Sequence, residues 1–250
     1  MTKSHRDWAN VIGETHATGR TYLEKAFNAY YFLSEKNAVK QLLIGEKRAS
    51  VIDVGTSYGN WYSFLKSESF NEIFGCEFVA SRAKKAAKLG YKEVFNCDAA
   101  RLPLADNVLQ CAVSNDVFVH IIRTADQIAV LEEMHRCLTD DGIFVLNFAS
   151  AKAFGYERDT VVDYCSYKTL ASILNMVHEQ GFLVEDIRPS YYSKPEAIKI
   201  EKLMRCLAVC VPFVGPRLLS ILDRFIVKPM SSIEYSDYIY FKLRKSKLSN

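Results

Sequence analysis

Short apolar runs alternate along the middle of the chain with segments whose apolar side chains recur at helical spacing. Apolar runs bounded by glycines and polar turns are typical of strands buried on both faces of a parallel sheet. The regular alternation of strand and helix predicts an α/β fold with a doubly wound, mostly parallel sheet. The strands expected in this part of the chain are residues 51–54, 73–77, 92–96, 109–113 and 143–148.

Helix-end signals lie between several of these strands. We expect Ser81 to cap a short helix that Gly90 ends, and Thr124 with Gln127 to form a capping box on the next helix. The Asp-Asp-Gly sequence at residues 140–142 is expected to break that helix before the fifth strand. Its predicted inner stripe is Ile128, Leu131, His135 and Leu138.

Two flanking regions extend the pattern. Residues 21–44 predict one or two amphipathic helices with an aromatic face, and residues 168–180 predict a helix that Gly181 ends. Residues 182–192 and 235–243 are expected to be strands. In the second of these, the side chains alternate, with Tyr238, Tyr240 and Lys242 on one face and Ile239, Phe241 and Leu243 on the other.

These segments predict one structural domain with three parts. An N-terminal helical cap is expected at residues 1–45, and the core at residues 46–193 and 233–250. A helical insertion at residues 194–232 separates the last two strands and is much longer than a hairpin loop.

Composition narrows the class of protein. The chain has 250 residues, of which 49% are hydrophobic and 24% charged, as in an ordinary globular domain. A net charge of +3 is too small to indicate a nucleic-acid partner. Seven cysteines without a C-x-x-C spacing indicate free thiols in a reducing compartment, and the polar first ten residues are unlike a signal peptide. We therefore expect a cytoplasmic protein.

The sequence V-I-D-V-G-T-S-Y-G at residues 51–59 places a tight turn after the first strand. Its glycines permit positive φ and let a ligand approach the backbone. Asp53 puts a carboxylate at the carboxyl end of the strand, where open α/β sheets bind ligands. That acid would repel a pyrophosphate and suits a cationic group. The turn also lacks the lysine of a P-loop and the G-x-G-x-x-G spacing of dinucleotide folds.

A second acid follows at the interval expected for ribose recognition. Glu77 ends the second strand and lies 24 residues after Asp53, where a dinucleotide-type fold places the acid that binds ribose hydroxyls. Together with the glycine turn, this acid predicts a site for a nucleoside-containing ligand.

Four ordered blocks, followed by a fifth, carry a resemblance to a known family. They are VIDVGTSYG, GCEFVASRAKKA, NCDAARLPLADN and SNDVFVHI, and LEEMHRCLTDDGIFVLN comes after them. In this order they resemble the class I S-adenosylmethionine-dependent methyltransferases, particularly those that methylate small molecules. The resemblance implies a Rossmann-like methyltransferase fold, a seven-stranded sheet with an antiparallel last strand, and S-adenosylmethionine as cofactor. Leu109-Gln110 replaces an aromatic-Asp pair usual in the family, and Asp141-Gly142 replaces a Pro-Gly, both away from the expected cofactor site.

The resemblance also implies roles for individual residues. Asp53 and the glycine turn would hold the methionine end of the cofactor, Glu77 the ribose, and Asp98 with Ala99 the adenine. The loop after the fourth strand would line the site beside the methionine moiety. The cofactor-binding residues expected on this basis are Asp53, Gly55, Thr56, Ser57, Tyr58, Gly59, Glu77, Asp98, Ala99, Asn115, Asp116 and Val117.

The methyl acceptor leaves fewer signals. His120 follows the fourth strand and is the candidate catalytic base, because imidazole titrates near neutral pH; the alternative is that it orients the loop or packs on Phe118. His16 and Tyr22 are candidate substrate contacts, because N-terminal helices in this family often cover the active site. The histidines and cysteines lack metal-ligand spacing, so we predict no metal.

The insertion at residues 194–232 is unusually apolar, with basic residues on its flanks. Its longest apolar run is too short to span a bilayer. It is interpreted as a lid over the site, a surface that touches a membrane or a lipid-linked substrate, or a subunit interface. The oligomeric state stays open.

The function expected is transfer of a methyl group to a small-molecule or a lipid- or sugar-linked acceptor, with O-methylation favoured. Three rival functions remain at this stage. One is a non-catalytic protein that binds the same cofactor. Another is a protein of the same fold that uses the cofactor for a different reaction. The third is a nicotinamide oxidoreductase, which the glycine spacing disfavours.

Overall fold

The computed structural model describes residues 22–191 and 232–246, with side chains from residue 31 onward. His16 and nearly all of the predicted insertion at residues 194–232 lie outside the described residues. Tyr22 is the first residue of a helix, but its side chain is not among those described. The predicted roles of these segments therefore stay predictions.

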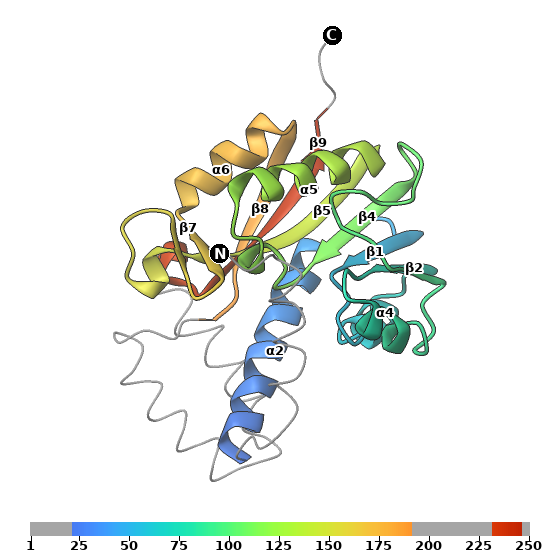
Figure 1. Ribbon diagram of the computed structural model, residues 1–250, viewed down its shortest axis with the longest axis horizontal. Coiled ribbons are helices and arrows are strands. Elements are labelled where there is room, and N and C mark those ends of the chain that lie inside the picture. Colours follow the sequence, from blue (N-terminus) through green and yellow to red (C-terminus); the bar gives the residue numbers. More distant parts are fainter. Residues whose placement is uncertain (1–21, 192–231, 247–250) are drawn as a thin grey trace.

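A twisted sheet forms the centre of the molecule (Figure 1). Its seven main strands pair in the order β3-β2-β1-β4-β5-β9-β8. Strand β9 runs antiparallel to β5 and β8, and the pairs from β3 to β5 are parallel. This is the predicted doubly wound sheet with an antiparallel last strand. The strands are β1 (Ser50–Val54), β2 (Glu72–Cys76), β3 (Glu93–Phe95), β4 (Leu109–Ser114), β5 (Leu138–Ser150), β8 (Phe182–Pro189) and β9 (Tyr238–Lys245).

A small hairpin that the apolar pattern does not predict extends the sheet. Strands β6 (Thr160–Val162) and β7 (Cys165–Lys168) are antiparallel to each other, and β7 pairs in parallel with the end of β5. The described part of the sheet therefore has nine strands. Both new strands are short and mixed in polarity, so they lack the apolar run that marks the others.

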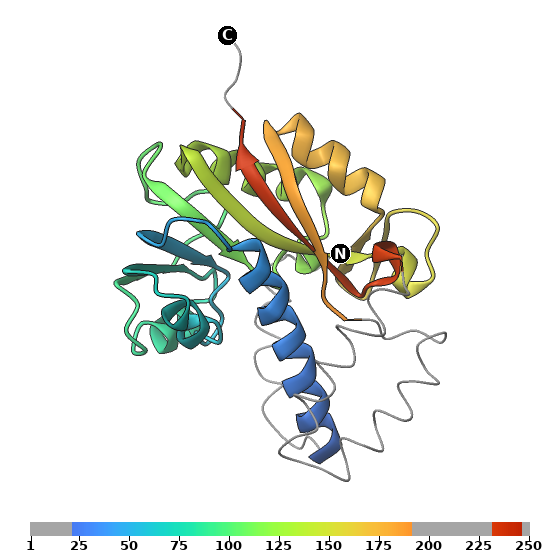
Figure 2. The ribbon, with the colours of Figure 1, turned by 180° about the vertical axis from the view of Figure 1, so that it is seen from behind.

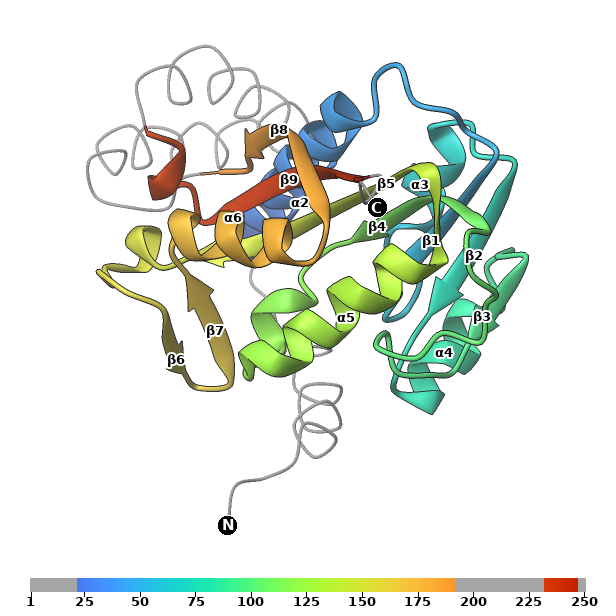
Figure 3. The same ribbon diagram turned by 90° about the horizontal axis from the view of Figure 1, so that it is seen from above.

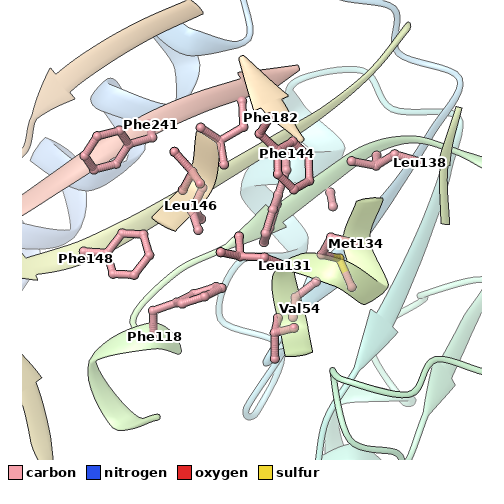
Figure 4. Packing of buried hydrophobic residues seen from close by; sticks show 14 of the residues in the cluster. Val54, Phe118, Leu131, Met134, Leu138, Phe144, Leu146, Phe148, Phe182 and Phe241 are labelled. Carbon is pink, nitrogen blue, oxygen red and sulfur yellow. The ribbon is translucent and has the colours of Figure 1, made fainter. Parts of the chain in front are cut away.

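Helices cover both faces of the sheet (Figure 3). On one face, α5 and α6 pack against the sheet through one large apolar cluster, part of which Figure 4 shows around Phe144 and Phe148 of β5. On the other face, α2, α3 and α4 contribute to a second cluster. The helices are α2 (Tyr22–Leu42), α3 (Tyr62–Ser67), α4 (Ala80–Ala86), α5 (Thr124–Cys137) and α6 (Leu170–Glu179), with 3₁₀ turns η1 (Phe118–His120), η2 (Lys152–Phe154) and η4 (Ile233–Tyr235).

The N-terminal region forms one long helix within the described residues. The C-terminal turns of α2 pack on the sheet, where Ala38, Val39 and Leu42 are buried. The rest of α2 extends away from the sheet (Figures 1 and 2). The helix therefore carries its middle residues past the loops that follow β4 and β8.

Two predicted helix caps are wrong. Arg123, not Thr124, occupies the N-cap of α5, and Gln127 is buried and donates to other groups instead of closing a capping box. Val79 occupies the N-cap of α4, where Ser81 was expected. In α5, tertiary hydrogen bonds of Gln127 replace the local capping box. At the start of α4, the nearby Glu77 carboxylate accepts the Val79 N–H.

The end of α5 also differs from the prediction. The helix ends at Cys137, and β5 begins at Leu138 and continues through the Asp-Asp-Gly sequence that was expected to break the helix. The buried side of α5 is correspondingly shifted from the predicted stripe. It consists of Gln127, Val130, Leu131, Met134 and Cys137.

Candidate active site

The glycine turn after β1 lies at the carboxyl edge of the sheet. Gly55 and Gly59 have φ of +79° and +82°, a region that side chains with a Cβ rarely adopt. The Gly55 and Thr56 N–H groups donate to the Cys76 carbonyl at 2.8 and 3.0 Å. A Cβ on Gly55 would lie 2.3 Å from Cγ2 of Val117, so the turn and the loop after β4 are in close contact. Two of the predicted site segments are thereby brought together.

Glu77 joins the glycine turn to the start of α4. Its buried carboxylate accepts the Ser57 N–H at Oε2 and the Val79 N–H at Oε1, both at 2.8 Å. A carboxylate has about four acceptor positions, so two remain for a ligand. The structure therefore places Glu77 beside the turn with the acceptor capacity that two ribose hydroxyls need.

Asp53 is buried next to the end of β1. The Tyr91 hydroxyl donates to its Oδ2 at 2.6 Å. Burial raises the pKa of Asp53 to about 7, with a further increase from the charge of Glu77, while the Tyr91 hydrogen bond lowers it. A bound cation would relieve the cost of this buried charge. Tyr91 was missed by sequence reasoning, because nothing in its neighbourhood distinguishes it from a packing residue.

Asp98 and Ala99 follow β3 at the same edge. The Asp98 side chain is exposed, and its Oδ1 accepts the Ala100 N–H at 3.0 Å. The Asn96 side chain donates to the Glu77 carbonyl at 2.8 Å, and the thiols of Cys76 and Cys97 lie 3.5 Å apart. These contacts fix the Asp98 segment beside the Glu77 segment. The five cysteines in the described ranges are all free thiols, as the sequence predicts.

The other two residues of the glycine turn lie at different depths. The Thr56 side chain is buried, and its Cγ2 would lie 2.5 Å from a Cβ on Gly75 of β2. Tyr58 is exposed, and the Lys85 ammonium lies 4.8 Å from the centre of its ring. Tyr58 thus faces outward at the rim of the site.

The loop after β4 is held by an amide on β5. Asn147 accepts the Asp116 N–H at 2.9 Å, and its Nδ2 lies 3.2 Å from Oδ1 of Asp116 and 3.4 Å from Oδ1 of Asn115. The Tyr240 hydroxyl also donates to Oδ1 of Asn115. Burial raises the pKa of Asp116 to about 6, while hydrogen bonds from Asn147 and Asn115 lower it.

A carboxyl group that sequence reasoning missed lies against this loop. Glu35 on α2 is buried and makes a hydrogen bond with the Asn115 side chain. Burial, followed by the negative charge of Asp116, raises the pKa of Glu35 well above its usual value. No local pattern in the sequence distinguishes Glu35 from the other polar and charged residues of α2.

His120 lies in the same loop, at the end of the 3₁₀ turn η1. The backbone N–H of His120 donates to the Val117 carbonyl at 2.9 Å. The buried Gln127 holds the turn by donating to the carbonyls of Phe118 and Ile121, at 3.1 and 2.8 Å. The backbone of His120 is therefore fixed relative to the loop that carries Asp116, and its role as a base stays a prediction.

Residues 31–191 and 232–246 hold no group of three or more His, Cys, Asp or Glu side chains arranged to bind a metal ion. In the same part of the chain, no helix is both long and apolar enough to cross a membrane.

Comparison with known proteins identifies a methyltransferase domain within the chain. A family model described as a methyltransferase domain matches residues 52–146. The rest of the chain lies outside this match. The match includes every predicted cofactor-binding residue and His120, whereas Glu35 and Asn147 lie outside it. The resemblance to the S-adenosylmethionine-dependent methyltransferases is confirmed.

Solved structures agree on the fold of this methyltransferase domain. An S-adenosylmethionine-dependent methyltransferase from Mesorhizobium loti is 14% identical, with a TM-score of 0.58 over 85% of this chain and 98% of that one. An O-methyltransferase from a Brevibacillus brevis multienzyme, in complex with S-adenosyl-L-homocysteine, is 16% identical, with a TM-score of 0.55 over 86% and 74%. The [4+2]-cyclase SpnF is 14% identical, with a TM-score of 0.57 over 85% and 80%. No curated protein matches the chain.

Proposed function

We propose that this chain binds S-adenosylmethionine at the carboxyl edge of the sheet and transfers the methyl group to a hydroxyl of a small-molecule acceptor. A lipid- or sugar-linked acceptor falls within the same proposal. The observation that carries it is the contact of the glycine turn with Glu77, through the Ser57 N–H at 2.8 Å. That bond brings together the two segments that the cofactor needs, one for its methionine end and one for its ribose.

The residues of the site fit the cofactor in shape and charge. Asp53 is a buried carboxylate that a cationic ammonium group would stabilise, and Glu77 has two free acceptor positions for vicinal hydroxyls. Asp98 is exposed at the neighbouring strand end and is free to accept from the adenine amino group. The O-methyltransferase from Brevibacillus brevis holds the demethylated cofactor on the same fold, which supports this assignment.

The reaction asks little of the protein beyond alignment and proton removal. When bound, the cofactor supplies a methyl group on a positively charged sulfur, and the neutral thioether that remains after transfer is a good leaving group. The loop after β4 then holds the acceptor in line, and such positioning accounts for much of the acceleration. His120 is proposed to accept the proton that an acceptor hydroxyl loses.

Isothermal titration calorimetry tests the cofactor assignment without knowledge of the acceptor. Wild-type protein should bind S-adenosylhomocysteine with a stoichiometry of one and should not bind NADH. Glu77→Ala should lose about 1–3 kcal/mol of binding free energy, because the ribose hydroxyls lose their acceptor. Glu93→Gln, an exposed acid on the neighbouring strand β3, is the matched control and should bind like wild type. Binding of NADH without binding of S-adenosylhomocysteine would overturn the proposal.

A further inference from the structure

Two carboxyl groups lie near each other where α2 passes the loop after β4: Glu35 is buried and Asp116 half-buried, and the charge of Asp116 raises the pKa of Glu35. Glu35 and Asp116 are joined through amides, since Asn115 hydrogen-bonds Glu35 and Asn147 hydrogen-bonds both Asp116 and Asn115. In the described part of the chain, neither carboxyl forms a salt bridge with a lysine, arginine or histidine. Buried acids normally require a positive partner or a proton.

Among the described residues around the pair, the positive charge of Lys36 lowers the pKa of Glu35, but burial and the charge of Asp116 outweigh it. The tyrosines Tyr191, Tyr238 and Tyr240 face it from the chain after β8 and from β9, and each has a pKa raised first by burial and then in part by these acids. Lys36, the nearest base on α2, places its ammonium 4.2 Å from the centre of the Phe32 ring, and the pKa of that ammonium is lowered by burial. The pair is therefore an acidic region within a shell of phenol groups.

The position of the pair within the site follows from Val117. That residue directly follows Asp116 and contacts Gly55 of the glycine turn, as its Cγ2 lies 2.3 Å from where a Cβ would be. Glu77 and Asp98 lie on the opposite side of the turn, at the ends of β2 and β3. Under the proposed function, Glu77 and Asp98 would hold the ribose and adenine on that side, which would leave Asp116 on the side of the sulfur.

We propose that Asp116 places a negative charge beside the sulfonium, and that Glu35 is a positioning residue that holds Asp116 there through Asn115, so that the site prefers the positively charged methyl donor to its neutral product. This inference rests on the proposed function. S-adenosylmethionine and S-adenosylhomocysteine share the ribose, the adenine and the amino-acid group, so Asp53, Glu77 and Asp98 affect both ligands alike. Only the charge on sulfur differs. The acidic pair would thus favour binding of the donor and release of the product.

The pH dependence of this preference follows from the pKa of Asp116. Its pKa of about 6 means that Asp116 is mostly ionised above pH 6 and mostly protonated below it. The preference for the donor should therefore grow as pH rises through about 6. Asp53, whose pKa of about 7 also lies in this range, changes both affinities together and leaves their ratio unchanged.

The test is calorimetry of the full-length protein with each of the two ligands at pH 5.5 and pH 7.5. Wild-type protein should bind S-adenosylmethionine on the order of tenfold more tightly than S-adenosylhomocysteine at the higher pH, the scale of one partly screened charge contact. The ratio should approach one at the lower pH. Asp116→Asn should show a ratio near one at both pH values.

Variants of Glu35 separate positioning from folding. Glu35→Gln keeps an acceptor for the Asn115 amide and should retain most of the ratio at pH 7.5, whereas Glu35→Ala loses the hydrogen bond and should lower the ratio toward one. Glu132→Gln, an exposed acid on α5, is the matched control and should leave the ratio unchanged. If Glu35→Ala does not fold, the pH profiles of wild type and Asp116→Asn still decide the matter.

The outcomes distinguish this inference from the function on which it rests. If wild-type protein binds neither ligand, the proposed function is wrong and this inference falls with it. If it binds both ligands equally at pH 7.5, or if Asp116→Asn keeps the wild-type ratio, only the inference about the acidic pair is overturned. Folded Glu35→Ala with an unchanged ratio would remove Glu35 from the account.

Discussion

The contact between Gly55 and Val117 leads to a quantitative prediction, because it connects the glycine turn to the loop after β4. Gly55→Ala adds a Cβ at a φ of +79°, where an L-residue costs about 1–2 kcal/mol. The same Cβ would lie 2.3 Å from Cγ2 of Val117, and overpacking of this kind costs about 1–3 kcal/mol. Gly55→Ala should therefore lower the free energy of unfolding by about 2–5 kcal/mol.

A second glycine separates the two contributions. Gly45 has nearly the same φ, +80°, with nothing within 4 Å of its added Cβ, so Gly45→Ala should show only the backbone cost of about 1–2 kcal/mol. Val117→Ala removes the clashing methyl group. In a double-mutant cycle it should couple to Gly55→Ala by about 1–3 kcal/mol, because the clash is absent when both are changed.

Equilibrium unfolding in urea measures wild type and the four variants, provided that the slope of the unfolding free energy against denaturant concentration stays constant. The reasoning is refuted if Gly55→Ala and Gly45→Ala cost the same, or if the cycle shows no coupling. Either result would mean that Val117 does not lie against the turn. The placement of Asp116 near the sulfur would then lose its structural basis.

Three further predictions concern the acids and the loop of the site. Because burial raises the pKa of Asp53 from 3.8 to about 7, the folded state binds its proton more tightly than the unfolded state, so stability should fall as pH rises from about 4 to about 7. Asp53→Asn keeps an acceptor for Tyr91 and should flatten this part of the pH–stability curve by at most about 4 kcal/mol. It should also weaken S-adenosylhomocysteine binding. An unchanged pH–stability curve would refute the raised pKa of Asp53. Gln127→Leu should cost about 1–3 kcal/mol in a urea titration, because the Ile121 carbonyl loses its donor and the Phe118 carbonyl keeps only the Ile121 N–H; a loss below about 0.5 kcal/mol would contradict this. With a hydroxyl acceptor, His120→Ala should lower kcat by roughly 10²–10⁴ while its affinity for S-adenosylhomocysteine stays unchanged. The exposed His178→Ala is the control. If His120→Ala turns over as fast as wild type, His120 is not the base.

The sequence predicts the central sheet well, because its strands are apolar on both faces and each ends at a glycine or a polar turn. The alternation in β9 also appears as predicted, with Ile239, Phe241 and Leu243 in the cluster under α5 and α6, and Tyr240 in the opposite one. The β6–β7 hairpin was missed because its strands are too short and polar to show a periodic pattern of apolar side chains. The predicted capping box at Thr124 failed because Gln127 makes tertiary hydrogen bonds instead, and the predicted cap at Ser81 failed because α4 already begins at Ala80.

The sequence placed the predicted cofactor-binding acids at one edge of the sheet, whereas it gave no sign of Glu35. Asp53 lies near the carboxyl end of β1, and Glu77 and Asp98 follow β2 and β3, so their positions are fixed by the order of strands in a parallel sheet. Glu35 lies on a helix far away in the sequence, and no local pattern shows that α2 passes the loop after β4. Contacts between distant segments of this kind depend on how helices pack, which a single sequence does not record.

The most direct test of the central claim is a crystal structure of the wild-type protein with S-adenosylhomocysteine. The account predicts the ribose hydroxyls within hydrogen-bond distance of the Glu77 carboxylate and the methionine ammonium near Asp53. It also predicts the sulfur on the side of the glycine turn that faces Asp116. A nucleoside bound elsewhere, or a ribose that does not touch Glu77, would contradict the account.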